Sequence, residues 1–239
     1  MDLFINNISH SYKNTNNKSL TNITFNIPKG SKHGIFGANG AGKSTLLKLI
    51  CNVMLPTEGS MIFVNKNDTI SDKIKIKQSI GYVPQDFAFY EELTIWQNIK
   101  YFGIMFNLTN DVIKQKYDDL IQTFGLTTHT NKKLKSLSGG MKRKVNLMLG
   151  LIHDPKVIIL DEPIVGIDVH SKNDILDYLN KLNTQGVTII YTSHQMNESQ
   201  SFCNNFTLLD KGKNIVTGDL KEVLNHQNKS NLESILLAL

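Results

Sequence analysis

The segment Gly37–Thr45, GANGAGKST, has the residue types needed to hold a chain of phosphate groups. It matches the pattern G-x-x-x-x-G-K-[ST], whose glycines let the main chain curl with its N–H groups pointing inward. A helix that begins at the lysine would add the positive end of its dipole. Lys43 is expected to contact the β- and γ-phosphates, and Ser44 to offer its hydroxyl to Mg²⁺. The predicted phosphate-binding residues are Gly37, Ala38, Asn39, Gly40, Ala41, Gly42, Lys43, Ser44 and Thr45.

Two carboxylates close the apolar run VIILDE, at Asp161 and Glu162. A buried strand that stops there places Asp161 at the edge where open α/β sheets bind ligands. Asp161 suits the shell of a magnesium ion, and Glu162 is positioned to polarise an attacking water. Together with the glycine loop, these residues indicate hydrolysis of a nucleoside triphosphate.

A second candidate phosphate site is the glycine pair in Leu137–Met141, LSGGM, which follows a serine and opens an expected helix. Main-chain N–H groups at such a helix start can hold an anion. One chain therefore carries two phosphate-binding segments.

These segments must be positioned by strands and helices, which the hydrophobic periodicity predicts. Strands alternating with helices argue for an α/β fold: a mostly parallel core sheet with flanking helices, an N-terminal antiparallel part and an inserted helical part. In the first helix, apolar residues recur at helical spacing at Leu46, Leu49, Ile50 and Val53. Strands are expected at 3–8, 22–30, 32–37, 57–65, 156–160 and 187–193, with a strand pair at 206–218; helices are expected at 43–54, within 86–136, at 139–152, 171–185 and 220–239.

Length and composition agree with one folded domain, because 239 residues with 40% hydrophobic and 20% charged content are ordinary for a globular protein. No apolar run approaches the roughly 18 residues needed to cross a bilayer, and the start lacks a secretion signal, so a cytoplasmic location is expected. The two cysteines lack metal-site spacing. The net charge of +5 comes from dispersed lysines, which are interpreted as a solvated surface.

The order of these motifs resembles the nucleotide-binding subunits of ABC transporters over nearly the whole chain. That resemblance implies the ABC-cassette type of P-loop fold and the cofactors ATP and Mg²⁺. It matches Tyr12 to the residue that stacks on adenine, Gly37–Thr45 to the P-loop, Gln85 to the Q-loop, Ser138, Gly139, Gly140 and Met141 to the signature motif, Asp161 and Glu162 to the Walker B pair, Asp168 to the D-loop and His194 to the switch histidine.

In that family two cassettes pair head to tail, so the resemblance implies that Ser138 and the Gly140 amide bind the γ-phosphate of ATP held by the partner. It further implies catalytic roles for Glu162, His194, Lys43, Gln85 and Asp168. Magnesium ligands would be Ser44, Gln85 and Asp161. Expected partners are a transmembrane permease and a second cassette, at the cytoplasmic face of the membrane, with no nucleic acid.

Met141 stands where the family most often has glutamine, and the run from Ser138 to Pro155 resembles cassettes of ABC-2 type exporters for drugs, antibiotics and bacteriocins. Alternatives are a soluble ABC ATPase of iron–sulfur cluster assembly and a nucleic-acid-associated ABC ATPase. At least one of Phe89 and Tyr90 is expected in a groove that receives the permease. Within the single domain 1–239, the expected parts are a catalytic core of 1–85 and 153–219, a helical subdomain of 86–152 and a helical tail of 220–239.

Overall fold

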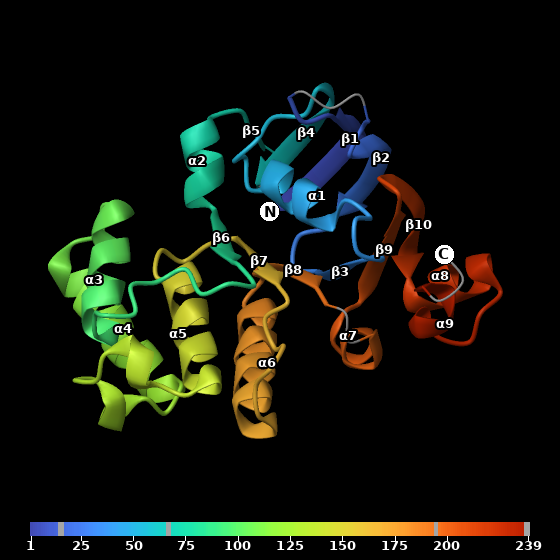
Figure 1. The fold of residues 1–239 in the computed structure, drawn as a ribbon. Coiled ribbons are helices and arrows are strands. Elements are labelled where there is room, and N and C mark those ends of the chain that lie inside the picture. The colour runs from blue at the N-terminus through green and yellow to red at the C-terminus, as the bar shows by residue number, and fades with distance from the viewer. Residues whose placement is uncertain (14–16, 66–67, 194–195, 237–239) are drawn as a thin grey trace.

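An antiparallel sheet of four strands is built from the first part of the chain, and its strand order is β2-β1-β4-β5 (Figure 1). The computed structural model describes residues 1–13, 17–65, 68–193 and 196–236. Alternate side chains of β1, such as Leu3 and Ile5, are buried, as expected for a half-buried strand. The strands expected near 3–8 and 22–30 are thereby confirmed. The sheet consists of β1 (Asp2–His10), β2 (Leu20–Ile27), β4 (Glu58–Asn65) and β5 (Asp68–Ile70).

A second sheet, with the order β10-β9-β3-β8-β7-β6, forms the centre of the molecule. Its strands from β9 to β6 are parallel, whereas β10 is antiparallel to β9. Parallel strands align their carboxyl ends at one edge, so the ends of β3, β6 and β7 lie close together. The strands are β3 (Lys32–Phe36), β6 (Ile80–Val83), β7 (Val157–Asp161), β8 (Thr188–Thr192), β9 (Asn205–Asp210) and β10 (Lys213–Asp219).

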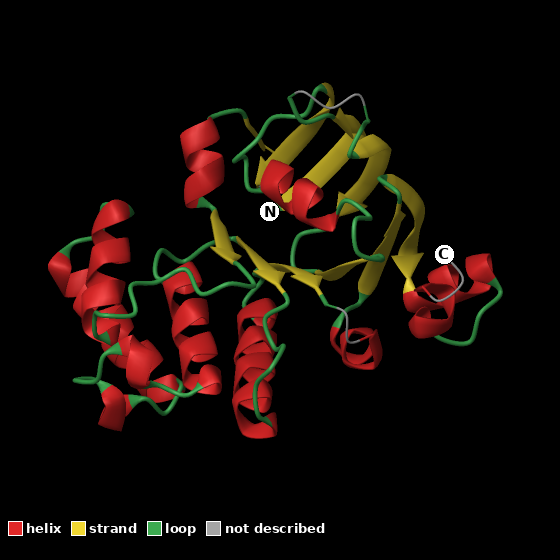
Figure 2. Cartoon of the chain, in the orientation of Figure 1, coloured by secondary structure: helices red, strands yellow, loops and turns green. Residues whose placement is uncertain are grey.

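Helices cover both faces of this second sheet (Figure 2). Side chains of β7 alternate between two cores: Ile159 packs toward α1 and the antiparallel sheet, and Ile158 packs toward the helices of the other face. The strand is therefore apolar throughout, as is usual for a parallel sheet covered on both sides. The expected α/β fold class is confirmed. The flanking helices are α1 (Lys43–Ile50), α5 (Gly139–Leu151), α6 (Val169–Thr184) and α7 (Met196–Phe202).

The expected end of the first helix is wrong, because α1 stops at Ile50 and not at residue 54. Asn52 takes a left-handed conformation, with φ of 53°. The N–H of Asn52 then bonds the Leu49 carbonyl at 2.9 Å, and that of Val53 bonds the Lys48 carbonyl at 3.1 Å. This pair of bonds is a Schellman motif, which satisfies the last carbonyls and turns the chain away. Val53 consequently lies outside the helix, with 69% of its surface exposed.

The segment between β6 and β7 contains helices and no strand among its described elements (Figure 1). Thr94 opens α3 with a capping box, since its hydroxyl accepts from the Gln97 N–H while Gln97 Oε1 accepts from the Thr94 N–H. Thr109 is the N-cap of α4, and its hydroxyl accepts from the Val112 N–H. The short helix α2 precedes β6, and its N-terminal N–H groups bond to Asp72. These helices are α2 (Lys73–Gln78), α3 (Ile95–Met105) and α4 (Asn110–Thr123).

Two short helices follow β10, namely α8 (Leu220–Gln227) and α9 (Leu232–Leu236). Before them, β10 runs along β2, the edge strand of the other sheet, and Asn214 Nδ2 donates to the Thr24 carbonyl at 3.1 Å. Within the described residues, every helix falls short of the length and apolarity that crossing a membrane requires.

Candidate functional site

The glycine loop Gly37–Thr45 connects the end of β3 to the start of α1, as the sequence predicts. Gly40 and Gly42 have φ of 81° and 104°, in the region that favours glycine. At Gly42 a side chain is also excluded by space, since its β-carbon would lie 2.6 Å from a methyl group of Leu20. Without side chains at these glycines, the main-chain N–H groups at the start of α1 can face an anion.

Lys43 reaches back over this loop. Its Nζ donates to the Gly37 carbonyl at 2.7 Å and to the Ala38 carbonyl at 3.1 Å. Burial lowers the pKa of Lys43, while the charges of Glu162 and Asp161 act in the opposite direction. The ammonium group thus lies between the loop and the two carboxylates.

Asp161 ends β7 and is held by groups from both neighbouring strands. Thr192, at the end of β8, donates its hydroxyl to Asp161 Oδ1 at 2.7 Å. From β6, the Tyr82 hydroxyl lies 3.4 Å from Asp161 Oδ2 and donates to it. Burial, followed by the negative charge of Asp161, raises the pKa of Tyr82, so this phenol remains a donor. These contacts fix the orientation of the carboxylate.

Glu162 follows directly and has an unusual backbone, with φ of 52°. Such a conformation costs roughly 1–3 kcal/mol for a residue other than glycine, and it is concentrated at functional sites. The Glu162 N–H bonds to the carbonyl of Thr192 at 3.2 Å and lies 3.3 Å from its hydroxyl. The side chain is only 3% exposed. A buried carboxylate is thus held beside the magnesium ligand that the sequence predicts.

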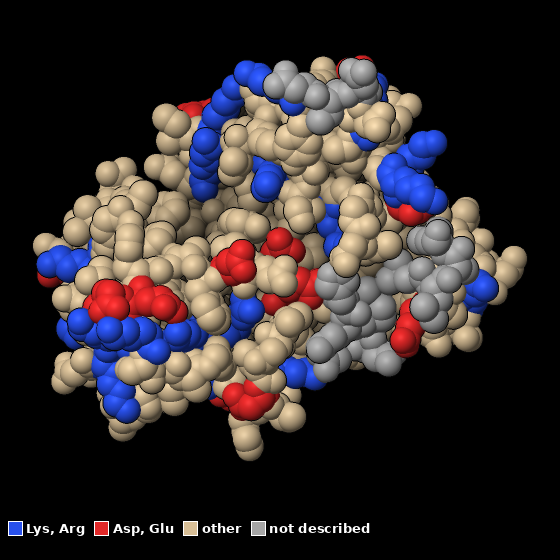
Figure 3. All heavy atoms as spheres, in the orientation of Figure 1, with Lys and Arg blue, Asp and Glu red and all other residues tan. Residues whose placement is uncertain are grey.

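A cavity of about 520 Å³ lies between the glycine loop and the two carboxylates, Asp161 and Glu162. Figure 3 shows acidic side chains near the centre of this face, where the strand ends of Figure 1 converge. The oxygen groups of Ser44, Asp161 and Gln85 line this one cavity, and hard oxygen ligands of this kind fit Mg²⁺. The lining consists of Lys18, Ser19, Asn39, Gly40, Ala41, Gly42, Lys43, Ser44, Thr45, Gln85, Asp161, Glu162 and Lys211.

Tyr12 lies beside the glycine loop. Its hydroxyl is 3.1 Å from Thr45 Oγ1, and its ring meets that of His10 edge to face at 5.1 Å between centroids. The side chain remains 40% exposed. A partly exposed aromatic ring beside the glycine loop can stack on a base.

The second glycine segment begins α5. Ser138 is the N-cap, and its hydroxyl accepts from the Met141 N–H at 3.3 Å. None of the four residues from Ser138 to Met141 is among the described residues that line the phosphate cavity. The structure therefore does not bring the two candidate phosphate sites of this chain together.

Asp168 caps the neighbouring helix α6, accepting from the Ser171 N–H at 2.9 Å. That hydrogen bond from the main chain, together with one from the Ser171 side chain, lowers the pKa of Asp168. Gly140 lies directly against this cap. His194, the expected switch residue, is outside the described residues.

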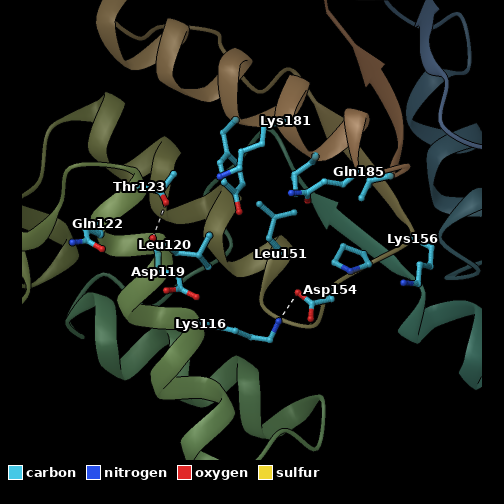
Figure 4. Close-up of a pocket in the computed structure, with 14 residues that line it drawn as sticks. Lys116, Asp119, Leu120, Gln122, Thr123, Leu151, Asp154, Lys156, Lys181 and Gln185 are labelled. Atoms are coloured by element: carbon cyan, nitrogen blue, oxygen red, sulfur yellow. Dashed lines mark hydrogen bonds and ion pairs between the residues drawn. The ribbon is translucent and has the colours of Figure 1, made fainter.

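A larger cleft, of about 670 Å³, lies between α4, the end of α5 and α6 (Figure 4). Lys116 and Asp154 form an ion pair across its rim, and Lys181 of α6 and Gln185, which follows α6, extend over it. Its walls combine such charges with leucines and offer no glycine loop that could surround phosphates. The smaller cavity, which the glycine loop lines, is therefore the better candidate for triphosphate chemistry.

The sequence of the chain matches a protein-family model. The model of the ABC transporter family matches residues 20–165, which include the glycine loop, the segment Leu137–Met141 and both carboxylates. The chain belongs to the ABC transporter family.

Curated relatives of this cassette carry consistent names. The linearmycin resistance ATP-binding protein LnrL of Bacillus subtilis is 39% identical over 82% of this chain and 63% of its own length. The ABC transporter ATP-binding protein NatA of the same organism is 32% identical over 92% of this chain and 90% of its own. The chain thus spans less than two thirds of the length of LnrL.

Solved structures agree. The ATP-binding subunit of an ABC transporter matches with a TM-score of 0.88 over 100% of this chain and 99% of its own, at 24% identity, which establishes the fold. The cassette MJ0796, in a dimeric post-hydrolysis state with ADP and Pi, is 26% identical with a TM-score of 0.80, over 91% of this chain and 98% of its own. The cassette is therefore ATP-binding, and the expectation of an ATPase is confirmed at the level of its family.

Several residues of the cassette's site were not predicted from the sequence. Thr192 and Tyr82 contact Asp161 across strands that are far apart in the chain, so only the strand register could reveal them. Lys18, just before β2, and Lys211, in the turn between β9 and β10, line the cavity without belonging to a motif. The sole sequence signal was that Thr192 is a polar residue ending an apolar run.

Proposed function

We propose that this cassette hydrolyses ATP to power export through a separate transmembrane permease, and that it works as a pair. The observation that carries the proposal is the separation of two phosphate-binding segments within one chain. Ser138–Met141 forms a capped helix start but does not line the cavity of the P-loop. A second copy, placed head to tail, would supply its segment to that cavity, so that ATP joins the pair and hydrolysis loosens it.

In this proposal the candidate site residues have separate tasks. Lys43 and the N–H groups of the loop hold the phosphates, and Tyr12 stacks on the base. Glu162 takes a proton from the attacking water. Asp168, which caps α6 beside the signature segment, links the two sites of the pair. His194 is assigned to the γ-phosphate from the sequence resemblance alone.

Magnesium is the metal that the donor set favours. Ser44, Asp161 and Gln85 would hold it, with Asp161 oriented by Thr192 and Tyr82. When bound, the ion neutralises charge on the phosphate oxygens. The contribution of the chain is to fix these oxygens in one cavity and to keep Lys43 beside them.

Export is supported by the names of relatives: one is a linearmycin resistance ATP-binding protein, and another, YbhF of Escherichia coli, is called a probable multidrug ABC transporter ATP-binding protein. A place at the cytoplasmic face of the membrane would follow from the proposed permease partner. Tyr90 is the better candidate for the permease groove. It is 50% exposed and meets Tyr101 edge to face at 5.2 Å, whereas Phe89 is half-buried against Phe87. Exposed aromatic residues of this kind are typical interface anchors.

For the division of the chain, we propose a catalytic core of 1–85 and 153–219 and a helical subdomain of 86–152. The absence of strands from the described elements between β6 and β7 supports it. The helical tail 220–239 forms the third part.

The decisive experiment uses Glu162→Gln, which keeps the size of the side chain but removes the base. Steady-state hydrolysis should fall by about 10²–10⁴-fold, while ATP binding persists. With saturating Mg-ATP the variant should elute as a dimer in size-exclusion chromatography with light scattering. Near-normal turnover, or a monomer under these conditions, would contradict the proposal.

The matched control is Glu162→Gln combined with Lys43→Ala, which should remain monomeric because the phosphates are no longer held. The permease is tested separately, by purifying the cassette from native membranes. A partner with several membrane-spanning helices supports transport, whereas only soluble partners or RNA would overturn it.

A further inference from the structure

The main chain of the Gln85 loop, defined as residues 84–88, is held by two side chains of α5. Arg143 Nη1 donates to the Gln85 carbonyl at 2.7 Å. Asn146 uses both ends of its amide: Nδ2 donates to the Pro84 carbonyl at 3.0 Å, and Oδ1 accepts from the Ala88 N–H at 3.0 Å. All three bonds reach main-chain atoms, so none of them occupies the Gln85 side chain.

Both side chains are buried, with Arg143 6% and Asn146 2% exposed. Burial lowers the pKa of Arg143 because a charged guanidinium is removed from water. Its Nε is buried without a hydrogen-bond partner among the described residues, and its guanidinium lies 5.0 Å from the centre of the Phe87 ring. A buried charge with incomplete partners is a poor source of stability. Its placement is better explained by the loop that it holds.

The same helix is also fixed to the strand that leads into the loop. A β-carbon on Gly81 of β6 would lie 2.2 Å from the Gly150 carbonyl of α5, and one on Gly150 would lie 2.6 Å from Val83. The strand and the helix are therefore in contact where both lack side chains. At its other end, α5 begins at Ser138. One helix thus connects the signature segment, the Gln85 loop and β6.

We propose that Arg143 and Asn146 are positioning residues for hydrolysis. They hold the Gln85 loop by its main chain, so that the Gln85 side chain lies in the cavity with Asp161 and its position follows that of the signature helix. This inference rests on the proposed function, because it gives Gln85 a task at the metal or the water. It adds a contact within one chain through which the position of the signature segment affects the hydrolytic site.

A double-mutant cycle tests whether Arg143 acts through Gln85. Arg143→Met should lower kcat by about tenfold, the effect of one lost buried hydrogen bond to a charged group, and change the Kd for ATP by less than about twofold. In a Gln85→Ala background the same substitution should lower kcat by less than about twofold further. Arg143→Lys, which retains the charge, should recover part of kcat. Independent, multiplying effects of Arg143→Met and Gln85→Ala would overturn the inference.

Lys144→Met is the matched control. Lys144 is an equally buried cation on the same helix, but its Nζ bonds to Asp174 at 2.6 Å and to the Phe124 carbonyl at 3.3 Å. The effect of Lys144→Met on kcat should multiply with that of Gln85→Ala, because the hydrogen bonds described for Lys144 go to Asp174 and Phe124 and not to the loop. If Lys144→Met instead behaves as Arg143→Met does, a general loss of packing explains both, and the inference fails.

Hydrogen exchange gives a readout that does not depend on activity. In Asn146→Leu the Ala88 amide loses its acceptor and should exchange about tenfold faster, while amides of β7 keep their rates. Unchanged exchange at Ala88 would overturn the inference whatever the kinetics. Faster exchange in a protein whose parent form lacks ATPase activity would locate the failure in the proposed function instead.

Discussion

The carboxylate of Asp168 lies where a side chain of residue 140 would have to go. A β-carbon on Gly140 would come within 2.7 Å of Asp168 Oδ2 and within 2.3 Å of Ser171 Oγ. Moving the Asp168 side chain aside would break its hydrogen bond with the Ser171 N–H, which caps α6. The start of the signature helix and the start of α6 therefore share one close contact.

Gly140→Ala should weaken this cap and destabilise the fold. Loss of an N-cap costs about 0.5–2 kcal/mol. For a domain of this size that corresponds to a fall in Tm of about 2–4 °C for each kcal/mol, measurable by calorimetry. The neighbouring Gly139→Ala is the control, because its β-carbon would meet nothing closer than 3.9 Å. Equal Tm values for the two variants would contradict the role of this contact.

Thr192→Val should weaken magnesium binding without reshaping the core. The substitution preserves the shape of a fully buried side chain but removes the hydroxyl that donates to Asp161 Oδ1. Loss of a group that orients a metal ligand typically costs about 10–100-fold in metal affinity. The midpoint of the Mg²⁺ dependence of ATP hydrolysis should therefore rise by that factor.

The control for this change is Thr192→Ser, which keeps the hydroxyl and should retain the parent midpoint to within about threefold, the usual context dependence of such contributions. A midpoint for Thr192→Val that matches the parent protein would show that Asp161 does not need this donor.

Much of the fold follows from local patterns, and the exceptions have local causes. The alternation in β1 and the continuous apolar run of β7 predict their strands correctly. The end of α1 was missed because the periodicity continues to Val53, whereas the left-handed Asn52 ends the helix. Helix α2 has no helical period to detect, since lysine and isoleucine alternate along Lys73–Lys77 and only Ile76 is buried.

The candidate site also has one part that the sequence predicts and another that it does not. The glycine loop predicts much of its own conformation, because its glycines Gly37, Gly40 and Gly42 all have positive φ. The contacts of Asp161 could not be predicted, since they depend on which residues of β6 and β8 stand beside the end of β7. Arg143 lies 58 positions from Gln85, and only the packing of α5 on β6 brings the two together.

Tyr12→Ala should reduce ATP affinity through loss of base stacking. Stacking on an aromatic ring is worth about 1–3 kcal/mol, which corresponds to roughly 5–150-fold in Kd. Isothermal titration would measure it, and inorganic tripolyphosphate, which lacks the base, should bind both proteins equally. Tyr12→Phe keeps the ring but loses the contact with Thr45, and its ATP affinity should stay near that of the parent. Weak ATP binding by the Tyr12→Phe variant would mean that the hydroxyl, and not the ring, determines the affinity.

His33 should make the fold less stable in mild acid. It is fully buried, with Nε2 2.8 Å from Thr207 Oγ1, and burial lowers its pKa to about 3. Between the unfolded pKa of about 6.5 and the folded pKa, only the unfolded chain binds the proton, so stability falls as the pH decreases. The free energy of unfolding should lose about 1.4 kcal/mol per pH unit from this group, with its full value present above that window.

Urea unfolding between pH 7 and pH 5 would measure this slope. His33→Gln retains a hydrogen-bonding partner for Thr207 but does not titrate, so its slope should be smaller than that of the parent. Identical slopes in the two proteins would mean that His33 can accept a proton in the folded state.

The contact of β10 with β2 bears on how copies of this protein can associate. The two edge strands face each other, and the Thr24 carbonyl, which could otherwise accept a bond from a foreign strand, is taken by Asn214. Edges covered in this way resist the intermolecular strand addition that leads to aggregates. Self-association is thereby steered away from this seam and toward other surfaces, among them the face that carries the glycine loop and the start of α5.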